Sequence, residues 1–130
     1  MISKELLDIF PVTAEVKKNH LHLGGCDMVD LAREYGTPLY IFDEETLRKQ
    51  CRDFVGQFTA RYSDTAVVYA CKAYINLTLA RIFQEEGLGL DVVSAGELAI
   101  ARAAGFPLSK AYFHGNNKGE DELRLALEWG

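Results

Sequence analysis

The sequence predicts an α/β fold built around a parallel sheet. From Ala66 onward, apolar runs rich in β-branched residues alternate with segments of helical periodicity, and the connections between them are short. The first run, Ala66–Lys72, has no polar alternation, which predicts a central strand buried on both faces. Right-handed crossovers would make such strands parallel.

A polar β-hairpin is expected near the start of the chain. Apolar and polar residues alternate through Val12–Leu23, and Lys18-Asn19 can form the turn. His20 and His22 would share one strand face, either as a metal-ligating pair or simply exposed to solvent. A helix over Met28–Tyr35 should follow, with Asp27 as N-cap and Gly36 ending it.

The α/β unit should begin after Pro38. We expect a short buried strand at Leu39–Phe42 and a long helix from Asp43 to about Tyr62. The break near Gly36-Thr-Pro38 divides the chain into an arm, residues 1–37, and an α/β portion, residues 38–130.

After Lys72 the pattern alternates between helix and strand. The expected elements are a helix from Asn76 to Glu86, a strand at Leu88–Val93, a helix reaching Ala104 with a Ser94–Glu97 capping box, a strand at Lys110–Phe113 and a helix over Glu120–Trp129.

Composition narrows the class of protein. The chain has 130 residues, a formal net charge of −5 and no basic run beyond Lys17-Lys18, which argues against nucleic acid as a partner. No apolar run approaches the roughly 20 residues of a membrane helix, and the charged first residues do not suit a signal peptide. Three cysteines without metal-ligand spacing fit a reducing cytoplasm.

Polar residues follow or end the three predicted strands. Lys72 ends the first, Asp91 lies near the end of the second, and His114, Asn116 and Asn117 follow the third. Because parallel strands end at one edge of a sheet, these residues should gather there with Ala70 behind the lysine, as in the active sites of α/β enzymes. Each also has an ordinary alternative: a lysine reaching solvent, an aspartate capping a turn, a histidine bonded within the core, or asparagines forming a turn.

Four ordered motifs resemble the N-terminal part of the diaminopimelate decarboxylase family, pyridoxal-phosphate enzymes of the alanine-racemase-like barrel class. The resemblance begins near Leu21 and covers nearly all that follows. Tyr74 stands where many relatives have Asn, and Gly119 where Ser or Thr is common. The motifs are Gly36-Thr-Pro-Leu-Tyr40, Tyr69-Ala-Cys-Lys-Ala-Tyr74, Gly89-Leu-Asp-Val-Val-Ser-Ala-Gly-Glu97 and His114-Gly-Asn-Asn-Lys118.

The resemblance implies that Lys72 bonds to pyridoxal 5′-phosphate, with Ala70 and Asp91 in the cofactor region and His114, Asn116 and Asn117 lining the site. It further implies the N-terminal portion of a PLP-binding (β/α)8 (TIM-like) barrel, an arm that joins a second β domain, and a homodimer. A complete barrel takes roughly 200 residues or more, so the chain is expected to be an incomplete portion of the enzyme.

The implied reaction is decarboxylation of meso-2,6-diaminopimelate to L-lysine, the last step of lysine biosynthesis. Related barrel enzymes acting on ornithine, arginine or carboxynorspermidine are the alternatives within the class. A small flavodoxin-like binding or signalling domain is the alternative outside it.

Overall fold

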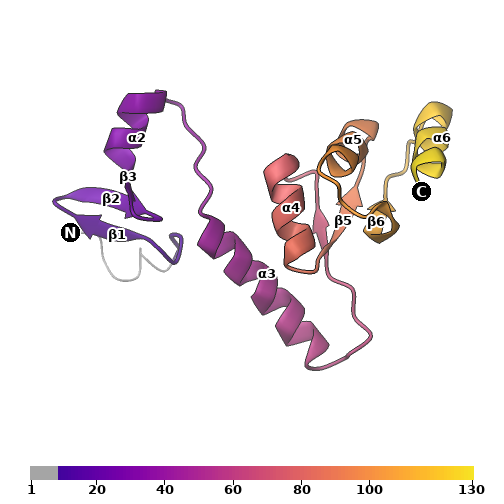
Figure 1. The fold of residues 1–130 in the computed structure, drawn as a ribbon, viewed down its shortest axis with the longest axis horizontal. Helices are drawn as coiled ribbons and strands as arrows, with labels where there is room; N and C mark the ends of the chain where they lie inside the picture. The colour runs from indigo at the N-terminus through magenta and orange to yellow at the C-terminus, as the bar shows by residue number, and fades with distance from the viewer. Residues whose placement is uncertain (1–8) are drawn as a thin grey trace. The chain divides into compact units, whose positions relative to one another are not determined.

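The computed structural model describes residues 9–130, which form two compact units. The first extends to Gln50 and the second covers Cys51–Gly130 (Figure 1). None of the helices within residues 9–130 combines the length and the hydropathy needed to cross a bilayer.

The first unit contains the predicted hairpin. Strand β1 (Glu15–Lys17) pairs antiparallel with β2 (His20–Leu23), and Lys18 and Asn19 make the turn with φ of 49° and 65°. The first strand starts later than Val12. A third strand, β3 (Cys26–Asp27), was not predicted; Gly24 and Gly25 turn the chain back to form it.

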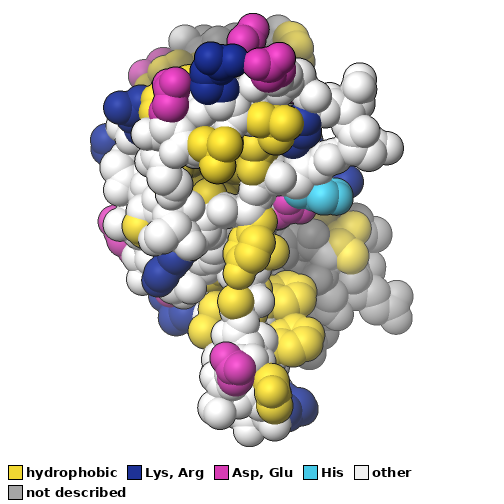
Figure 2. Space-filling model, turned by 90° about the vertical axis from the view of Figure 1, so that its right-hand side faces the viewer, with side chains coloured by type: hydrophobic (Ala, Val, Ile, Leu, Met, Phe, Trp, Pro, Cys, Tyr) yellow, Lys and Arg dark blue, Asp and Glu magenta, His cyan; other side chains and the backbone are white. Residues whose placement is uncertain are grey.

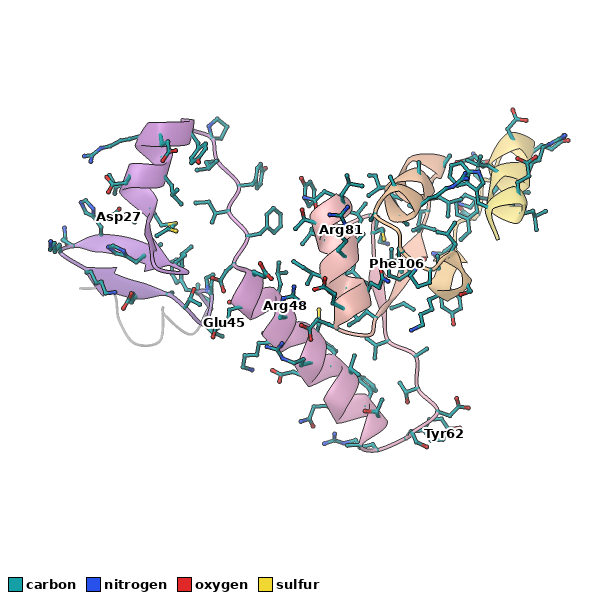
Figure 3. The ribbon with its side chains drawn as sticks, in the orientation of Figure 1. Asp27, Glu45, Arg48, Tyr62, Arg81 and Phe106 are labelled. Carbon is teal, nitrogen blue, oxygen red and sulfur yellow. The ribbon has the colours of Figure 1, made fainter. Side chains whose placement is uncertain are left out.

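Helix α2 (Met28–Tyr35) has the predicted limits. The Oδ1 atom of Asp27 accepts hydrogen bonds from the amides of Val29 at 2.8 Å and Asp30 at 3.4 Å, which caps the first turn (Figure 3). Gly36 ends the helix with φ of 81°, a conformation that favours glycine.

The predicted buried strand at Leu39–Phe42 is wrong. The segment is irregular, and its side chains are exposed, from 38% for Leu39 to 90% for Tyr40. A strand needs a neighbour to accept its backbone hydrogen bonds, and the described residues pair no strand with this segment. The segment is apolar, as the sequence shows, but the packing within residues 9–130 does not bury its side chains.

Helix α3 (Glu44–Thr59) starts as predicted and ends three residues before Tyr62. Asp43 caps it by accepting a 2.8 Å hydrogen bond from the Thr46 amide. The other carboxylate oxygen of Asp43 accepts one from the Thr13 hydroxyl at 2.6 Å, which fixes the start of the helix to the segment before β1.

The second unit has the predicted alternation of strands and helices around a parallel sheet of order β4-β5-β6. Each strand precedes a helix along the chain, as the sequence indicated. The elements are β4 (Val68–Ala70), α4 (Leu77–Glu85), β5 (Gly89–Val92), α5 (Ala95–Ala103), a 3₁₀ turn (Leu108–Lys110), β6 (Ala111–Phe113) and α6 (Glu120–Trp129).

The helix starts follow the predicted caps, with one change. Asn76 Oδ1 accepts from the Leu79 amide at 2.8 Å, and Ser94 Oγ accepts from the Glu97 amide at 3.2 Å. The Glu97 carboxylate accepts a hydrogen bond of 2.8 Å from the amide of Val93, which lies one residue before the position that a capping box requires. Glu97 therefore stabilises the turn between β5 and α5.

The core lies on the helix-covered face of this sheet. Leu90 and Val92 of β5 are completely buried, and Cys71 and Phe83 are each 2% exposed. The opposite face is open, since Val68 is 40% and Tyr112 57% exposed. Figure 2 shows hydrophobic side chains at the surface on the side that it displays.

Two predictions about the first parallel strand are therefore wrong. The strand covers only Val68–Ala70, and Lys72 lies in the turn after it. It is also an edge strand rather than the central one, since β5 lies in the middle of the described sheet. The apolar run indicates burial on both faces. In the described chain, helices cover only one face of the sheet, and β4 pairs with a strand along only one of its edges.

Candidate active site

Lys72, Asp91 and His114 lie at the carboxyl edge of the parallel sheet. Ala70 pairs in register with Asp91, and the Cys71 amide donates to the Asp91 carbonyl at 2.9 Å. The His114 amide donates to the Val92 carbonyl at 2.8 Å, directly after β6. The structure thus brings these three residues to one edge of the sheet, as the sequence predicted. Their roles stay predictions.

The turn that carries Lys72 is held at both ends. The Ala73 amide donates to the Ala70 carbonyl at 3.2 Å, and the Tyr69 hydroxyl donates to the Tyr74 carbonyl at 2.9 Å. The Tyr69 ring is itself stacked on Phe83 at 4.0 Å between centroids. Lys72 is exposed and has no ion pair or hydrogen bond of its side chain with any of residues 9–130. Its amine is therefore available on a fixed turn.

Asp91 carries a buried polar atom without a partner. Its Oδ1 has no hydrogen-bond partner in the part of the chain that the structure describes, and lies 3.7 Å from Nδ1 of His114. The His114 side chain is 71% exposed, whereas that of Asp91 is only 23% exposed. A buried carboxylate oxygen left unpaired is costly, so this position favours a donor supplied by a ligand or by His114.

The loop after β6 contains the remaining predicted residues. Asn116 and Asn117 are exposed there. The contact that sequence reasoning missed is that of Lys118, whose Nζ donates to the Val93 carbonyl at 2.8 Å and lies 4.0 Å from the centre of the Phe113 ring. The sequence placed Lys118 in a polar loop but carried no signal for the direction of its side chain.

Cys71 precedes Lys72 but is not suited to be the nucleophile. Burial, together with the nearby negative charges of Glu97 and Asp91, raises the pKa of its thiol to about 12. The thiol is therefore protonated at neutral pH, and a protonated thiol is a poor nucleophile.

The histidine pair of the hairpin is occupied by Asp27. Its Oδ2 lies 2.7 Å from His20 Nδ1 and 3.6 Å from His22 Nε2, so the two rings do share one face. The hydrogen bond with His20 lowers the pKa of the Asp27 carboxyl. Residues 9–130 contain no group of three side chains placed to hold a metal ion.

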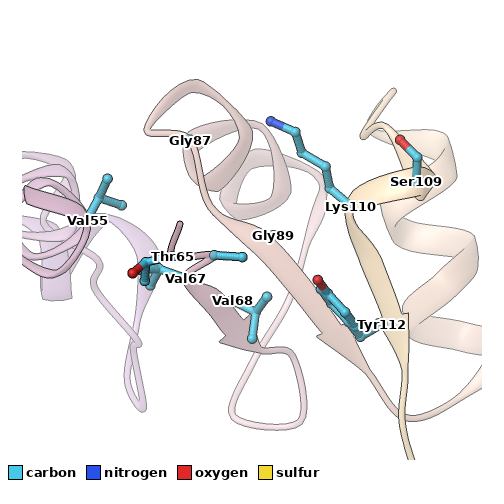
Figure 4. Close-up of a pocket in the computed structure, with 10 residues that line it drawn as sticks. Val55, Thr65, Val67, Val68, Gly87, Gly89, Ser109, Lys110 and Tyr112 are labelled. Carbon is cyan, nitrogen blue, oxygen red and sulfur yellow. The ribbon is translucent and has the colours of Figure 1, made fainter. Parts of the chain in front are cut away.

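A hollow of about 250 Å³ lies at the opposite edge of the sheet, away from Lys72 (Figure 4). Its lining includes Val68 and Gly89, the first residues of β4 and β5, Lys110 just before β6, and Tyr112 within β6. Gly89 packs closely against Val68 and Lys110. A Cβ there would lie 2.7 Å from the Lys110 carbonyl oxygen and 2.9 Å from Val68 Cγ1, so close strand packing requires glycine.

Known proteins resemble the chain in sequence and in fold. It is 48% identical over 109 residues to a diaminopimelate decarboxylase of Bacillus subtilis, covering 84% of this chain and 25% of that protein. It is 47% identical over 122 residues to one of Methanothermobacter thermautotrophicus, covering 94% and 28%. The crystal structure of diaminopimelate decarboxylase from M. jannaschii with L-lysine matches with a TM-score of 0.78 and 34% identity, covering 90% of this chain and 28% of that one.

The chain spans about a quarter of the length of these relatives. The family model of the pyridoxal-dependent decarboxylases, pyridoxal-binding domain, matches residues 44–130, which include β4, β5, β6 and their helices. The chain therefore belongs to the pyridoxal-dependent decarboxylase family.

Proposed function

We propose that this chain is the Lys72-bearing N-terminal part of a decarboxylase that converts meso-2,6-diaminopimelate to L-lysine. The observation that carries the proposal is a free lysine on a braced turn, within the family's pyridoxal-binding domain. The relatives named above are diaminopimelate decarboxylases, and one solved relative contains L-lysine. The family match decides against the flavodoxin-like alternative.

The cofactor of this family is pyridoxal phosphate, and the carboxyl edge of the sheet fits it. Lys72 offers an exposed amine, Ala70 ends β4 with a small side chain, and Asp91 offers an unpaired carboxylate oxygen. These three residues would hold the cofactor. When bound, pyridoxal phosphate withdraws the electrons left on the substrate carbon after carbon dioxide departs.

Residues of this chain would then orient groups and move protons. The Lys72 amine would hold the cofactor and, when free, would be the group that gives a proton to the reacting carbon or takes one from it. The Oδ1 atom of Asp91 would pair with a positive charge or a hydrogen-bond donor. Nδ1 of His114, 3.7 Å away, would supply it. The exposed amides of Asn116 and Asn117 would line the site.

The remaining architecture follows from the same proposal. Residues 38–130 would form the first part of a (β/α)8 barrel, and residues 1–37 an arm that packs on a separate β domain. The groups that bind the cofactor phosphate and read the substrate would come from beyond Gly130. We further propose a homodimer, in the cytoplasm, acting in lysine biosynthesis without a nucleic-acid or membrane partner.

A substrate assay tests the proposed reaction. The complete decarboxylase that contains this chain should release carbon dioxide and lysine from meso-2,6-diaminopimelate. Ornithine, arginine and carboxynorspermidine, assayed at equal concentrations, should give far slower release of carbon dioxide. Faster turnover of any of these three would assign the chain to a different branch of the same family.

A further inference from the structure

The loop between β6 and α6 is fixed to the end of β5 by the side chain of Lys118. The Lys118 ammonium donates to the Val93 carbonyl at 2.8 Å and lies over the Phe113 ring. It also lies against the backbone of Gly115, where a Cβ atom would be only 2.6 Å from Nζ. The side chain therefore runs back across its own loop, and Gly115 leaves the space for it.

The turn that Lys118 contacts is fixed from several sides. The amide of Val93 donates to Glu97 Oε2 at 2.8 Å, so side chains satisfy both polar backbone groups of Val93. Glu122 connects the same two segments, since it accepts from the amides of Ala95 at 3.2 Å and Gly119 at 3.1 Å. These contacts make the loop after β6 and the turn after β5 one braced assembly.

His114 begins the loop that Lys118 closes. Its amide is bonded to the Val92 carbonyl, yet its side chain is 71% exposed and its Nδ1 lies 3.7 Å from the unpaired Oδ1 of Asp91. The described residues make no other ion pair or hydrogen bond with the His114 side chain, so its position next to Asp91 depends on the backbone of the loop. The conformation of the loop thus decides whether this pair stays together.

We propose that Lys118 is a positioning residue, which keeps His114 beside Asp91 by fixing the loop to the Val93 carbonyl. The proposal rests on the proposed function, because it assigns His114 and Asp91 to the same active site. Lys118 would act without touching the substrate. Its own ammonium is engaged by a carbonyl and a ring, so it is not free to bond to the cofactor.

The test compares variants of the complete decarboxylase. Lys118→Met keeps the length of the side chain and removes the donor, whereas Lys118→Arg keeps a donor and the positive charge. Lys110→Met is the matched control, because Lys110 is an exposed lysine next to the same strand at the opposite edge (Figure 4).

Lys118→Met should lower kcat/KM about tenfold to a hundredfold, because small displacements of active-site groups have effects of that size. The pyridoxyl content at Lys72 should not change, and hydrogen exchange of the segment 113–119 should become faster. Lys118→Arg should restore most of the activity, and Lys110→Met should match the wild type. Activity that falls only together with the melting temperature, without rescue by arginine, would reduce Lys118 to a fold-stabilising residue.

A double-mutant cycle with His114→Ala tests whether Lys118 acts through His114. Lys118→Met should have little further effect on kcat/KM in the His114→Ala background; additive losses would overturn the proposal. If the wild-type protein fails to decarboxylate meso-diaminopimelate, the proposed function is wrong. Hydrogen exchange of segment 113–119 still decides the positioning role in that case: exchange equal in Lys118→Met and Lys110→Met would overturn it.

Discussion

Lys72 and Lys118 lie near the same edge of the sheet in opposite environments. The Lys118 ammonium is bonded to a carbonyl and covered by a ring, whereas that of Lys72 has no partner among residues 9–130. An amine must be free, and must lose its proton, to attack an aldehyde. The difference between the two lysines therefore comes from their neighbours rather than from the residue type.

We predict that the cofactor bonds to Lys72. Borohydride reduction of the complete, cofactor-loaded enzyme followed by peptide mapping should locate the pyridoxyl group there. Lys72→Met should abolish the label, and Lys110→Met should retain it. A pyridoxyl group found on Lys110 would contradict the assignment to Lys72. One found on Lys118 would also contradict the bonded state of the Lys118 ammonium.

At the level of single elements, local signals predicted where helices start. Asp27, Asn76 and Ser94 each bond to an amide of the first helical turn, as their residue types and positions indicated. Those bonds span two or three residues, so the sequence alone contains the information. The path of Lys118 to Val93 spans 25 residues, and no pattern in the chain encodes it.

Strand burial was predicted less well for a related reason. The apolar runs at Leu39–Phe42 and Val68–Ala70 indicate residues that should be covered, but not what covers them. β5 is buried because it has a strand on each side and helices over one face. Burial of a strand depends on its neighbours. The strand's own sequence does not show which distant segments of the chain will become those neighbours.

The packing of β5 against its neighbours gives a prediction about Gly89. Gly89→Ala should destabilise the protein by about 1–3 kcal/mol, because the added methyl group would meet a backbone oxygen that cannot move without disturbing β6. Thermal melting of the complete protein measures the effect.

Gly96→Ala is the matched control for this prediction. Gly96 lies in α5, where the nearest atom to an added Cβ is Ser94 Oγ at 3.8 Å. The substitution should be neutral or stabilising by up to about 1 kcal/mol, since alanine favours a helix over glycine. Equal melting temperatures for the two variants would show that the strands separate enough at Gly89 to admit a side chain.

At the scale of the whole chain, the parallel sheet of residues 51–130 has an open face and two edge strands. β4 and β6 each have an unpaired side in the described sheet, and Val68 and Tyr112 expose apolar surface on the open face. Unpaired edges and exposed apolar faces promote association with other chains. In the proposed enzyme, the rest of the barrel would cover these surfaces.

The isolated chain of residues 1–130 should therefore lack decarboxylase activity, bind pyridoxal phosphate only weakly, and associate. Light scattering measures the association, and a cofactor titration measures the binding. Tyr112→Lys, which places a charge on the open face, should reduce association; Tyr62→Lys, at a 67% exposed position outside the sheet, should not. A monodisperse wild-type monomer with a cooperative melt and tight cofactor binding would mean that the three strands form a self-sufficient domain, and that the open face needs no cover.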